Sequence, residues 1–187
     1  MHLNFVYIFS NFFKRYKGEK MKVLVTYFSQ TGNTEKLARA IYDGIEKKFS
    51  KEISPMEDVK NLDDYDLIFC GFPVHSSSVP VKAESFIKRI PKGKNLVFFA
   101  THGSLRGGKL AITAFHYCIC LVPKAKILGT FGCRGEVQRA IIEKMMNNLE
   151  HKSWALEAQS AVGHPDAADL DNAKEFTGWM ISNFLHR

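Results

Sequence analysis

Five polar side chains surround one glycine near the start of the chain. They follow the apolar run of residues 23–28, and the segment consists of Ser29, Gln30, Thr31, Gly32, Asn33 and Thr34. A strand that turns tightly into a helix leaves backbone N–H groups free at the positive end of the helix dipole, where an anion is best held. Gly32 lets the backbone curl around that anion, and the hydroxyl and amide side chains add donors. The segment therefore predicts a phosphate-binding loop.

This loop lacks the group that binds the terminal phosphates of a nucleoside triphosphate. It contains no lysine, and residues 29–34 do not fit the pattern G-x-x-x-x-G-K-[ST]. A monophosphate is therefore the expected ligand. An ordinary helix cap is the alternative interpretation, but a cap needs one such side chain and this loop has several.

Three segments together resemble the flavodoxin family. Residues 26–34 resemble its FMN-phosphate loop, residues 64–74 its third strand and first flavin loop, and residues 95–103 its fourth strand and second flavin loop. Their order and spacing agree over roughly residues 21–135. The resemblance implies FMN as the cofactor. It also implies an α/β fold, a three-layer sandwich with a doubly wound, five-stranded parallel sheet.

The resemblance places the cofactor beyond the carboxyl ends of the strands. Ligands of open parallel sheets bind there, and flavodoxin with FMN is itself a standard example of the rule. Residues 29–34 would hold the phosphate, and residues 72–79 and 101–109 would hold the flavin ring. The implied ring-binding residues are Pro73, Val74, His75, Ser76, Thr101, His102, Gly103, Arg106 and Gly107.

The two ring loops offer few aromatic side chains, whereas flavodoxins usually cover both faces of the ring. The first loop has His75, with Phe72 at the strand end, and the second has His102 or Leu105. One face of the ring is therefore expected to stay open to a substrate or a partner cofactor.

Charge and glycine content also depart from the pattern of flavodoxin carriers. Neither loop contains Asp or Glu, residues 72–79 contain no glycine, and the second loop carries Arg106 and Lys109. Positive charge near a flavin stabilises its reduced anion, which favours a reductase over a one-electron carrier. Solvation of both cations at the surface is the alternative interpretation.

The periodicity of apolar residues predicts alternating strands and helices, as in a parallel sheet wound on both sides. Strands are expected at residues 23–28, 51–54, 67–71, 96–100 and 126–132. Helices are expected at residues 34–48, 81–90 and 110–121, from about residue 136, and from about residue 164, with residues 154–163 ambiguous. The roughly thirty residues before the last helix form an insertion, residues 136–164. It could hold partner specificity, although a helix that covers the sheet edge is the simpler expectation.

Residues 1–20 do not share the pattern of the rest. They are apolar and aromatic, then basic, and Met21 opens the first strand. A secretory signal has its positive charge before the apolar stretch, and a spanning helix is longer. Met21 as the true start is favoured over a membrane-surface anchor or a helix packed on the domain. Residues 1–20 are thus predicted to be an extension and residues 21–187 the flavodoxin-like domain, with membrane binding expected only if the extension is a real anchor.

Composition and charge limit the class of protein and the partners that are expected for it. The chain has 187 residues with 45% hydrophobic content, enough for one folded domain. Its net charge is +7, of which residues 1–20 carry +3 and the rest +4. No basic stripe or nucleic-acid motif accompanies this charge, so an acidic partner is expected and nucleic acid is not. The four cysteines form no C-x-x-C, which predicts reduced thiols and a cytoplasmic protein.

These features predict an FMN-binding, flavodoxin-like electron-transfer protein. The expected partner is a redox protein or a nicotinamide cofactor. The alternative function is an FMN-dependent reductase that passes hydride from NAD(P)H to a quinone or another small acceptor. A further alternative is a binding domain of this fold without a flavin.

Overall fold

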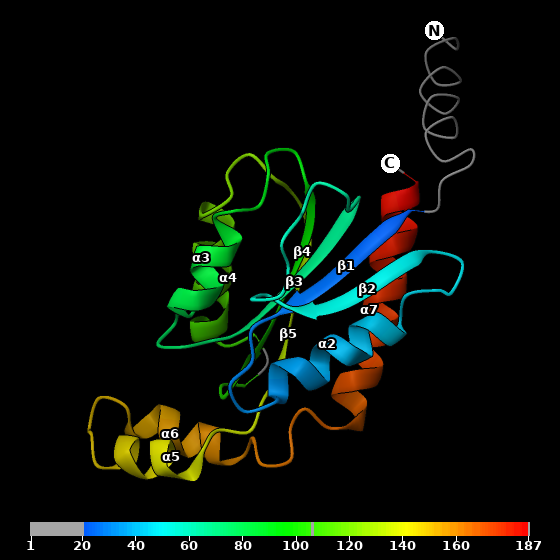
Figure 1. The fold of residues 1–187 in the computed structure, drawn as a ribbon. Helices are drawn as coiled ribbons and strands as arrows, with labels where there is room; N and C mark the ends of the chain where they lie inside the picture. The colour runs from blue at the N-terminus through cyan, green and yellow to red at the C-terminus, as the bar shows by residue number, and fades with distance from the viewer. Residues whose placement is uncertain (1–20, 106, 187) are drawn as a thin grey trace, which may run out of the picture.

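Five parallel strands form the centre of the molecule. The computed structural model describes residues 21–105 and 107–186, whose arrangement Figure 1 shows. The strands lie in the order β2-β1-β3-β4-β5, so the strand order reverses between β1 and β3. Their bounds are β1 Lys22–Tyr27, β2 Ser50–Pro55, β3 Leu67–Pro73, β4 Asn95–His102 and β5 Lys126–Arg134. The reversal places a binding crevice at the carboxyl ends of these central strands.

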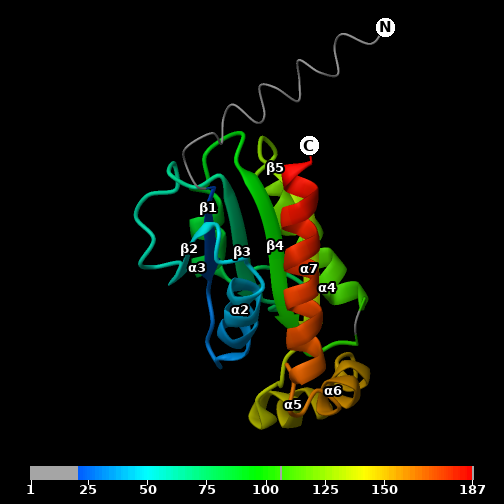
Figure 2. The same cartoon turned by 90° about the vertical axis from the view of Figure 1, so that its right-hand side faces the viewer.

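Helices cover both faces of the sheet and complete three layers. The helices α2 (Asn33–Asp43) and α7 (Ala167–Leu185) pack on one face, and α3 (Val81–Ile87) and α4 (Lys109–Cys120) pack on the other. Figure 2 shows α2 and α7 side by side in front of the strands. Because both faces are covered, β3 and β4 are almost entirely buried. The predicted fold class is confirmed.

The end of α2 differs from the prediction. The apolar spacing predicted a helix to residue 48, but α2 ends at Asp43, and Gly44 follows as its C-cap. A Cβ atom at Gly44 would lie 2.8 Å from the carbonyl oxygen of Lys174, because α7 passes close to the backbone there. Ile45 is still buried beyond the helix end, which explains why its spacing looked helical.

The insertion forms a helical hairpin, α5 (Arg139–Met146) and α6 (Lys152–Gln159). The two helices pack on each other through a small apolar cluster of their own, which includes Ile142 and Ala155. Figures 1 and 2 show the hairpin beyond the carboxyl ends of the strands rather than along an edge strand. The expectation that this insertion covers the sheet edge is therefore wrong.

Successive residues of β4, the strand that leads to the candidate site, pack on opposite faces of the sheet. Val97 and Phe99 belong to the core under α2 and α7, whereas Phe98 and Ala100 belong to the core under α3 and α4.

Within the described ranges no helix is long and apolar enough to cross a bilayer. The predictions for residues 1–20 fall outside those ranges.

Candidate functional site

The predicted phosphate loop joins β1 to α2 through a left-handed glycine. Gly32 is the N-cap of α2 with φ of 88°, and no side chain caps this helix end. The N–H of Gly32 donates to Oγ of Ser29 at 3.1 Å, which closes the turn. Because the first turn of a helix has no internal acceptors for its N–H groups, an uncapped end keeps donors for a ligand. Gln30 and Thr31 lie exposed beside it.

Contacts from distant segments hold this loop. The Thr34 and Thr101 hydroxyl oxygens lie 2.8 Å apart, and both side chains are buried. The side-chain amide of Asn33 donates to the carbonyl oxygen of Glu136 at 2.9 Å, at the base of the hairpin. Gly135 leaves room for this approach, because a Cβ atom there would lie 3.1 Å from Cβ of Thr101. The Thr34 and Asn33 side chains thus fix the loop, and contact of either with a phosphate stays a prediction.

The first ring loop is a tight two-residue turn. The backbones of His75 and Ser78 exchange two hydrogen bonds, at 3.0 and 2.8 Å. Ser76 and Ser77 between them have φ of 46° and 62°. This is the conformation of a type I′ turn, which normally uses Asn or Gly and costs other residues about 1–2 kcal/mol each. The sequence showed that a glycine is missing, but the turn was not predicted.

The two ring loops are joined at their bases. The N–H of Val74 donates to the carbonyl oxygen of Thr101 at 2.8 Å, immediately after Pro73 ends β3. His75 is largely exposed, and the limited burial of its ring lowers its pKa. Phe72 is fully buried and makes edge contacts with Phe98 and Phe115, at centroid distances of 6.4 and 6.0 Å. Phe72 therefore cannot stack on a ligand outside the strand ends.

The insertion that contains the hairpin packs against the second ring loop. Gly103 is buried, and a Cβ atom there would lie 2.5 Å from Cγ2 of Val137 and 3.3 Å from Cζ2 of Trp154. Gly107 is exposed with φ of 75°. Arg106 lies outside the described residues, and Lys109 is the exposed first residue of α4.

The hairpin also brings a carboxylate to this loop, although the loop sequence has none. The backbone N–H of Leu105 donates to Oε1 of Glu157. Arg134 fixes the end of α6 by donating to the carbonyl oxygen of Glu157 at 3.0 Å and to that of Ser160 at 2.8 Å. The two ring loops themselves contain no Asp or Glu, so this carboxylate comes from outside them. No local pattern signals the contact, because Leu105 and Glu157 are 52 residues apart.

His102 points to the opposite face of the sheet from Thr101, as strand alternation requires. Its Nδ1 lies 3.0 Å from the carbonyl oxygen of Ser104, and the side chain is 5% exposed. Burial lowers the pKa of His102 by desolvation, and the positive charge of Arg134 acts in the same direction. The ring is thus neutral at pH 7, with a proton on Nδ1 for the bond to Ser104.

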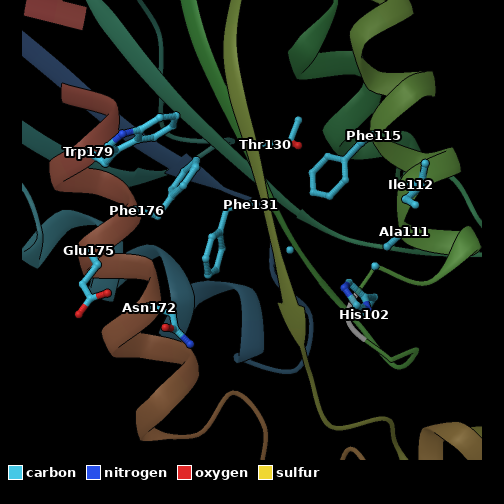
Figure 3. Close-up of a pocket in the computed structure, with 12 residues that line it drawn as sticks. His102, Ala111, Ile112, Phe115, Thr130, Phe131, Asn172, Glu175, Phe176 and Trp179 are labelled. Carbon is cyan, nitrogen blue, oxygen red and sulfur yellow. The ribbon is translucent and has the colours of Figure 1, made fainter. Parts of the chain in front are cut away.

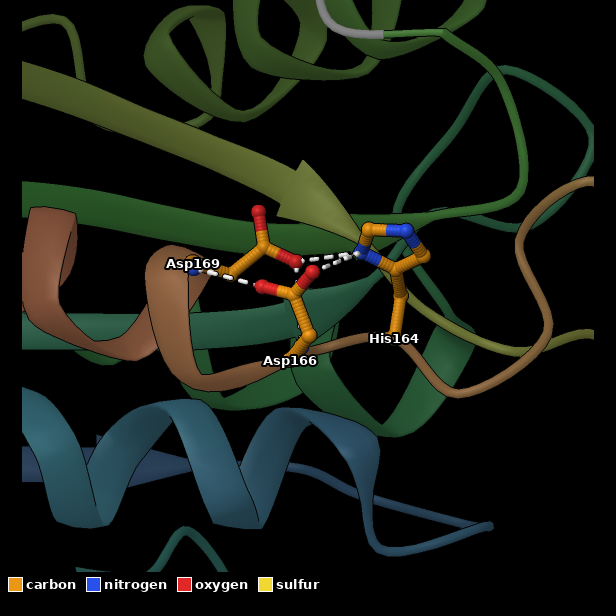
Figure 4. A group of neighbouring side chains, drawn as sticks. All are labelled: His164, Asp166 and Asp169. Carbon is orange, nitrogen blue, oxygen red and sulfur yellow. Dashed lines mark hydrogen bonds and ion pairs between the residues drawn. The ribbon is translucent and has the colours of Figure 1, made fainter.

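A second polar cluster lies where α7 begins (Figure 4). Asp166 and Asp169 form a capping box, in which Oδ1 of Asp166 accepts from the Asp169 N–H at 2.9 Å. Nδ1 of His164 lies 2.5 Å from Oδ2 of Asp169. The hydrogen bond from the Asp169 backbone, followed by the nearby His164, lowers the pKa of Asp166. These contacts are those of a helix cap, and the sequence had predicted a helix start here.

The sequence matches a known protein family over most of its length. Residues 24–178 match the flavodoxin domain family. BilS of Clostridioides difficile (strain CD3), a flavodoxin-like domain-containing protein, is 30% identical over 171 residues, which cover 86% of this chain and 97% of BilS. The oxidised Flavodoxin 2 of Bacillus cereus has a TM-score of 0.60 at 19% identity, covering 87% of this chain and 99% of its own. A flavodoxin from the domain Archaea has a TM-score of 0.58 at 19% identity, with 89% and 100% covered.

Proposed function

Because the chain belongs to the flavodoxin domain family, we propose that it binds FMN and transfers electrons. The observation that carries this proposal is the uncapped N-terminus of α2, which begins at the left-handed Gly32. Such an end offers backbone N–H groups and a positive helix dipole to a phosphate. FMN is the flavin that presents a terminal monophosphate.

The residues around this end fit a phosphate in shape and charge. Gly32 and Thr31 are exposed, and a Cβ atom at Gly32 would meet no atom within 4 Å, so the loop is open on that side. The hydroxyl group of Thr31 and the backbone N–H groups of the first turn would be the donors. Residues 29–34 contain no carboxylate that would repel the phosphate.

The ring of FMN would lie between the loops after β3 and β4. The Val74–Thr101 hydrogen bond holds these two loops together, next to the switch in strand order between β1 and β3. When bound, the isoalloxazine ring supplies one- or two-electron redox chemistry. Residues 73–76 and 101–107 would orient the ring, and Glu157 would place a negative charge beside the second loop.

A reductase that uses a nicotinamide cofactor is the second candidate. Supporting it, Phe72 is buried in the core and His102 is turned toward α4, so neither is placed to cover a ring beyond the strand ends. An uncovered ring face suits hydride transfer, which needs direct contact between donor and ring. Adding NADPH to the FMN-loaded protein without oxygen distinguishes the candidates. Bleaching of the flavin absorbance within seconds supports the reductase, whereas an unchanged spectrum supports an electron carrier that works with a redox protein.

Calorimetry with FMN and riboflavin tests the proposal on the full chain. Each charge-assisted hydrogen bond contributes about 1.5–3 kcal/mol, so we expect FMN to bind more than tenfold tighter than riboflavin. Thr31→Ala should weaken FMN and leave riboflavin unchanged. Thr113→Ala, on the exposed side of α4, is the matched control and should change neither affinity. Equal affinities for FMN and riboflavin would overturn the phosphate site, and a protein that binds neither would be a flavin-free domain.

A further inference from the structure

A pocket of about 600 Å³ lies along the edge strand β5, on the far side of β4 from β3. Figure 3 shows it between α4 and α7, with β5 passing through the view. Residues on both faces of β5 line it. The Phe131 side chain points to one face of the sheet, and Thr130 and Gly132 face the other. Its volume falls within the range of about 300–1,000 Å³ that is usual for small-molecule sites.

The most deeply placed polar group of this pocket is the imidazole of His102. The side chain is 5% exposed, and Nδ1 is engaged with the carbonyl oxygen of Ser104 at 3.0 Å. Nε2 has no hydrogen-bond partner among residues 21–105 and 107–186. The side chain of His102 lines the pocket, so this nitrogen is available to form a hydrogen bond with a ligand.

A glycine keeps this nitrogen accessible. A Cβ atom at Gly132 would lie 3.2 Å from Nε2 of His102 and 3.3 Å from Cε2 of Phe115. Any other residue at position 132 would therefore cover the nitrogen. Since the neutral ring carries its proton on Nδ1, Nε2 presents a lone pair and accepts a hydrogen bond. The ligand must then supply an N–H or O–H donor.

Aromatic and aliphatic side chains make up most of the remaining wall. Phe115 is on the α4 side with Ile112, and Phe176 and Trp179 are on the α7 side. The Phe131 and Phe176 rings pack with centroids 5.1 Å apart, and Trp179 is 62% exposed. A ligand at His102 would contact Phe115 and Ile112, which lie on the same side of β5, and an aromatic ring such as Phe115 favours a flat, polarisable ligand.

We propose that this pocket binds a planar aromatic molecule whose N–H or O–H donates to Nε2 of His102. Phenols and naphthols are the simplest members of this class. His102 and Gly107 belong to both the pocket and the second ring loop, so the ligand would lie next to the proposed FMN site. The pocket lies at β5, whereas the proposed FMN site lies at the loops after β1, β3 and β4, so we expect both ligands to bind at the same time.

A matched pair of probes tests the hydrogen bond. The full chain is titrated with 2-naphthol and with 2-methoxynaphthalene, which lacks the donor, in the presence and absence of FMN. We expect 2-naphthol to bind at least tenfold tighter and to shift the imidazole ¹⁵N resonance of Nε2. Gly132→Ala should weaken 2-naphthol at least tenfold, and His102→Phe should remove the difference between the probes. The exposed His151, changed to Phe, is the control and should alter neither result.

Three outcomes would overturn the proposal. The first is equal affinity for both probes, and the second is a preference for 2-naphthol that persists in Gly132→Ala. The third is displacement of FMN by 2-naphthol, because the pocket would then be part of the flavin site. The first two outcomes can be measured without FMN, in proteins that retain His102. They therefore stay decisive if the His102→Phe variant does not fold. Failure of FMN to bind would contradict the proposed function and leave this test intact.

Discussion

The phosphate end and the ring end of the proposed site are built in different ways. The phosphate end uses one short segment, residues 29–34, whose backbone faces the ligand directly. The ring end is assembled from parts far apart in the chain. The Val74 N–H donates to Thr101, Gly103 packs against Val137, and the Leu105 N–H donates to a carboxylate of α6. The first is contiguous in sequence, although Asn33 and Thr34 tie it to Glu136 and Thr101, whereas the second consists mainly of contacts between distant segments.

This difference gives each end its own sensitivity. A change in α5 or α6 should alter the ring end more than the phosphate end, because the phosphate loop meets the insertion at Glu136, before α5 begins. It should then weaken FMN and riboflavin by similar factors, since both carry the same ring. A change at Thr31 should weaken FMN alone. The ratio of the two affinities therefore reports which end has been disturbed.

The largest effect is expected from Gly103→Ala. The new Cβ would lie 2.5 Å from Cγ2 of Val137, so the hairpin must move away from the loop. We expect a loss of about 3 kcal/mol in the free energy of unfolding, measured with urea. Hydrogen exchange should speed up within residues 136–164, and the FMN to riboflavin ratio should change less than either affinity does, because the insertion meets the phosphate loop through the Asn33–Glu136 hydrogen bond.

A second substitution controls for a general loss of stability. Val137→Ala removes the methyl groups that the new Cβ would meet, so the double variant should regain part of the lost stability and of the hairpin's protection. Unchanged exchange within residues 136–164 in Gly103→Ala would contradict the packing of the hairpin on this loop. The ring end would then be as local as the phosphate end.

An intermediate effect is expected at the buried hydroxyl pair of Thr34 and Thr101, which lie 2.8 Å apart. Thr34→Val leaves the Thr101 hydroxyl without its partner, which should cost about 2 kcal/mol. Replacing both with Val removes both polar groups and should restore most of the stability. Chemical denaturation of the two single variants and the double variant measures this, with Thr113→Val as the exposed control. Additive losses would show that the two hydroxyls do not depend on each other.

Sequence patterns predicted what local physical chemistry determines. The apolar runs identified the strands, because a parallel strand covered on both faces is buried throughout, as in β3. The turn from β1 into α2 was predictable because Gly32 and its polar neighbours are contiguous, and phosphate binding there stays a prediction. Both features follow from residues within one turn or one strand.

The remaining features depend on contacts that the sequence does not encode locally. The end of α2 is set by the approach of α7 to Gly44, and the position of the hairpin by its packing on Gly103. The contact of Glu157 with Leu105 joins residues 52 positions apart. Periodicity correctly predicted a helix near residue 139, but it contains no information about the surface on which that helix packs.

The smallest effect is expected from pH, and it belongs to the ring end alone. Residues 29–34 contain no titratable side chain, whereas burial lowers the pKa of His102 from 6.5 and Arg134 adds to that shift. The hydrogen bond to the Ser104 carbonyl, and then Glu157 and Asp169, raise the pKa of His102 but do not cancel the effect of burial. As the pH falls through 6.5, the unfolded chain takes up a proton before the folded protein does, so the folded state should lose stability.

The expected slope for this one group is at most about 1.4 kcal/mol per pH unit, between pH 6.5 and the lower pKa of the folded state. Urea denaturation from pH 7.5 to pH 5, without FMN, should show this loss in the wild type. His102→Gln can keep the contact with Ser104 without titrating, so its curve should be flatter, whereas His151→Gln should retain the wild-type slope. If the His102→Gln and wild-type curves run parallel, the buried imidazole is not the origin of the pH dependence. His75, whose pKa burial also lowers, would then be the next histidine of the ring end to replace.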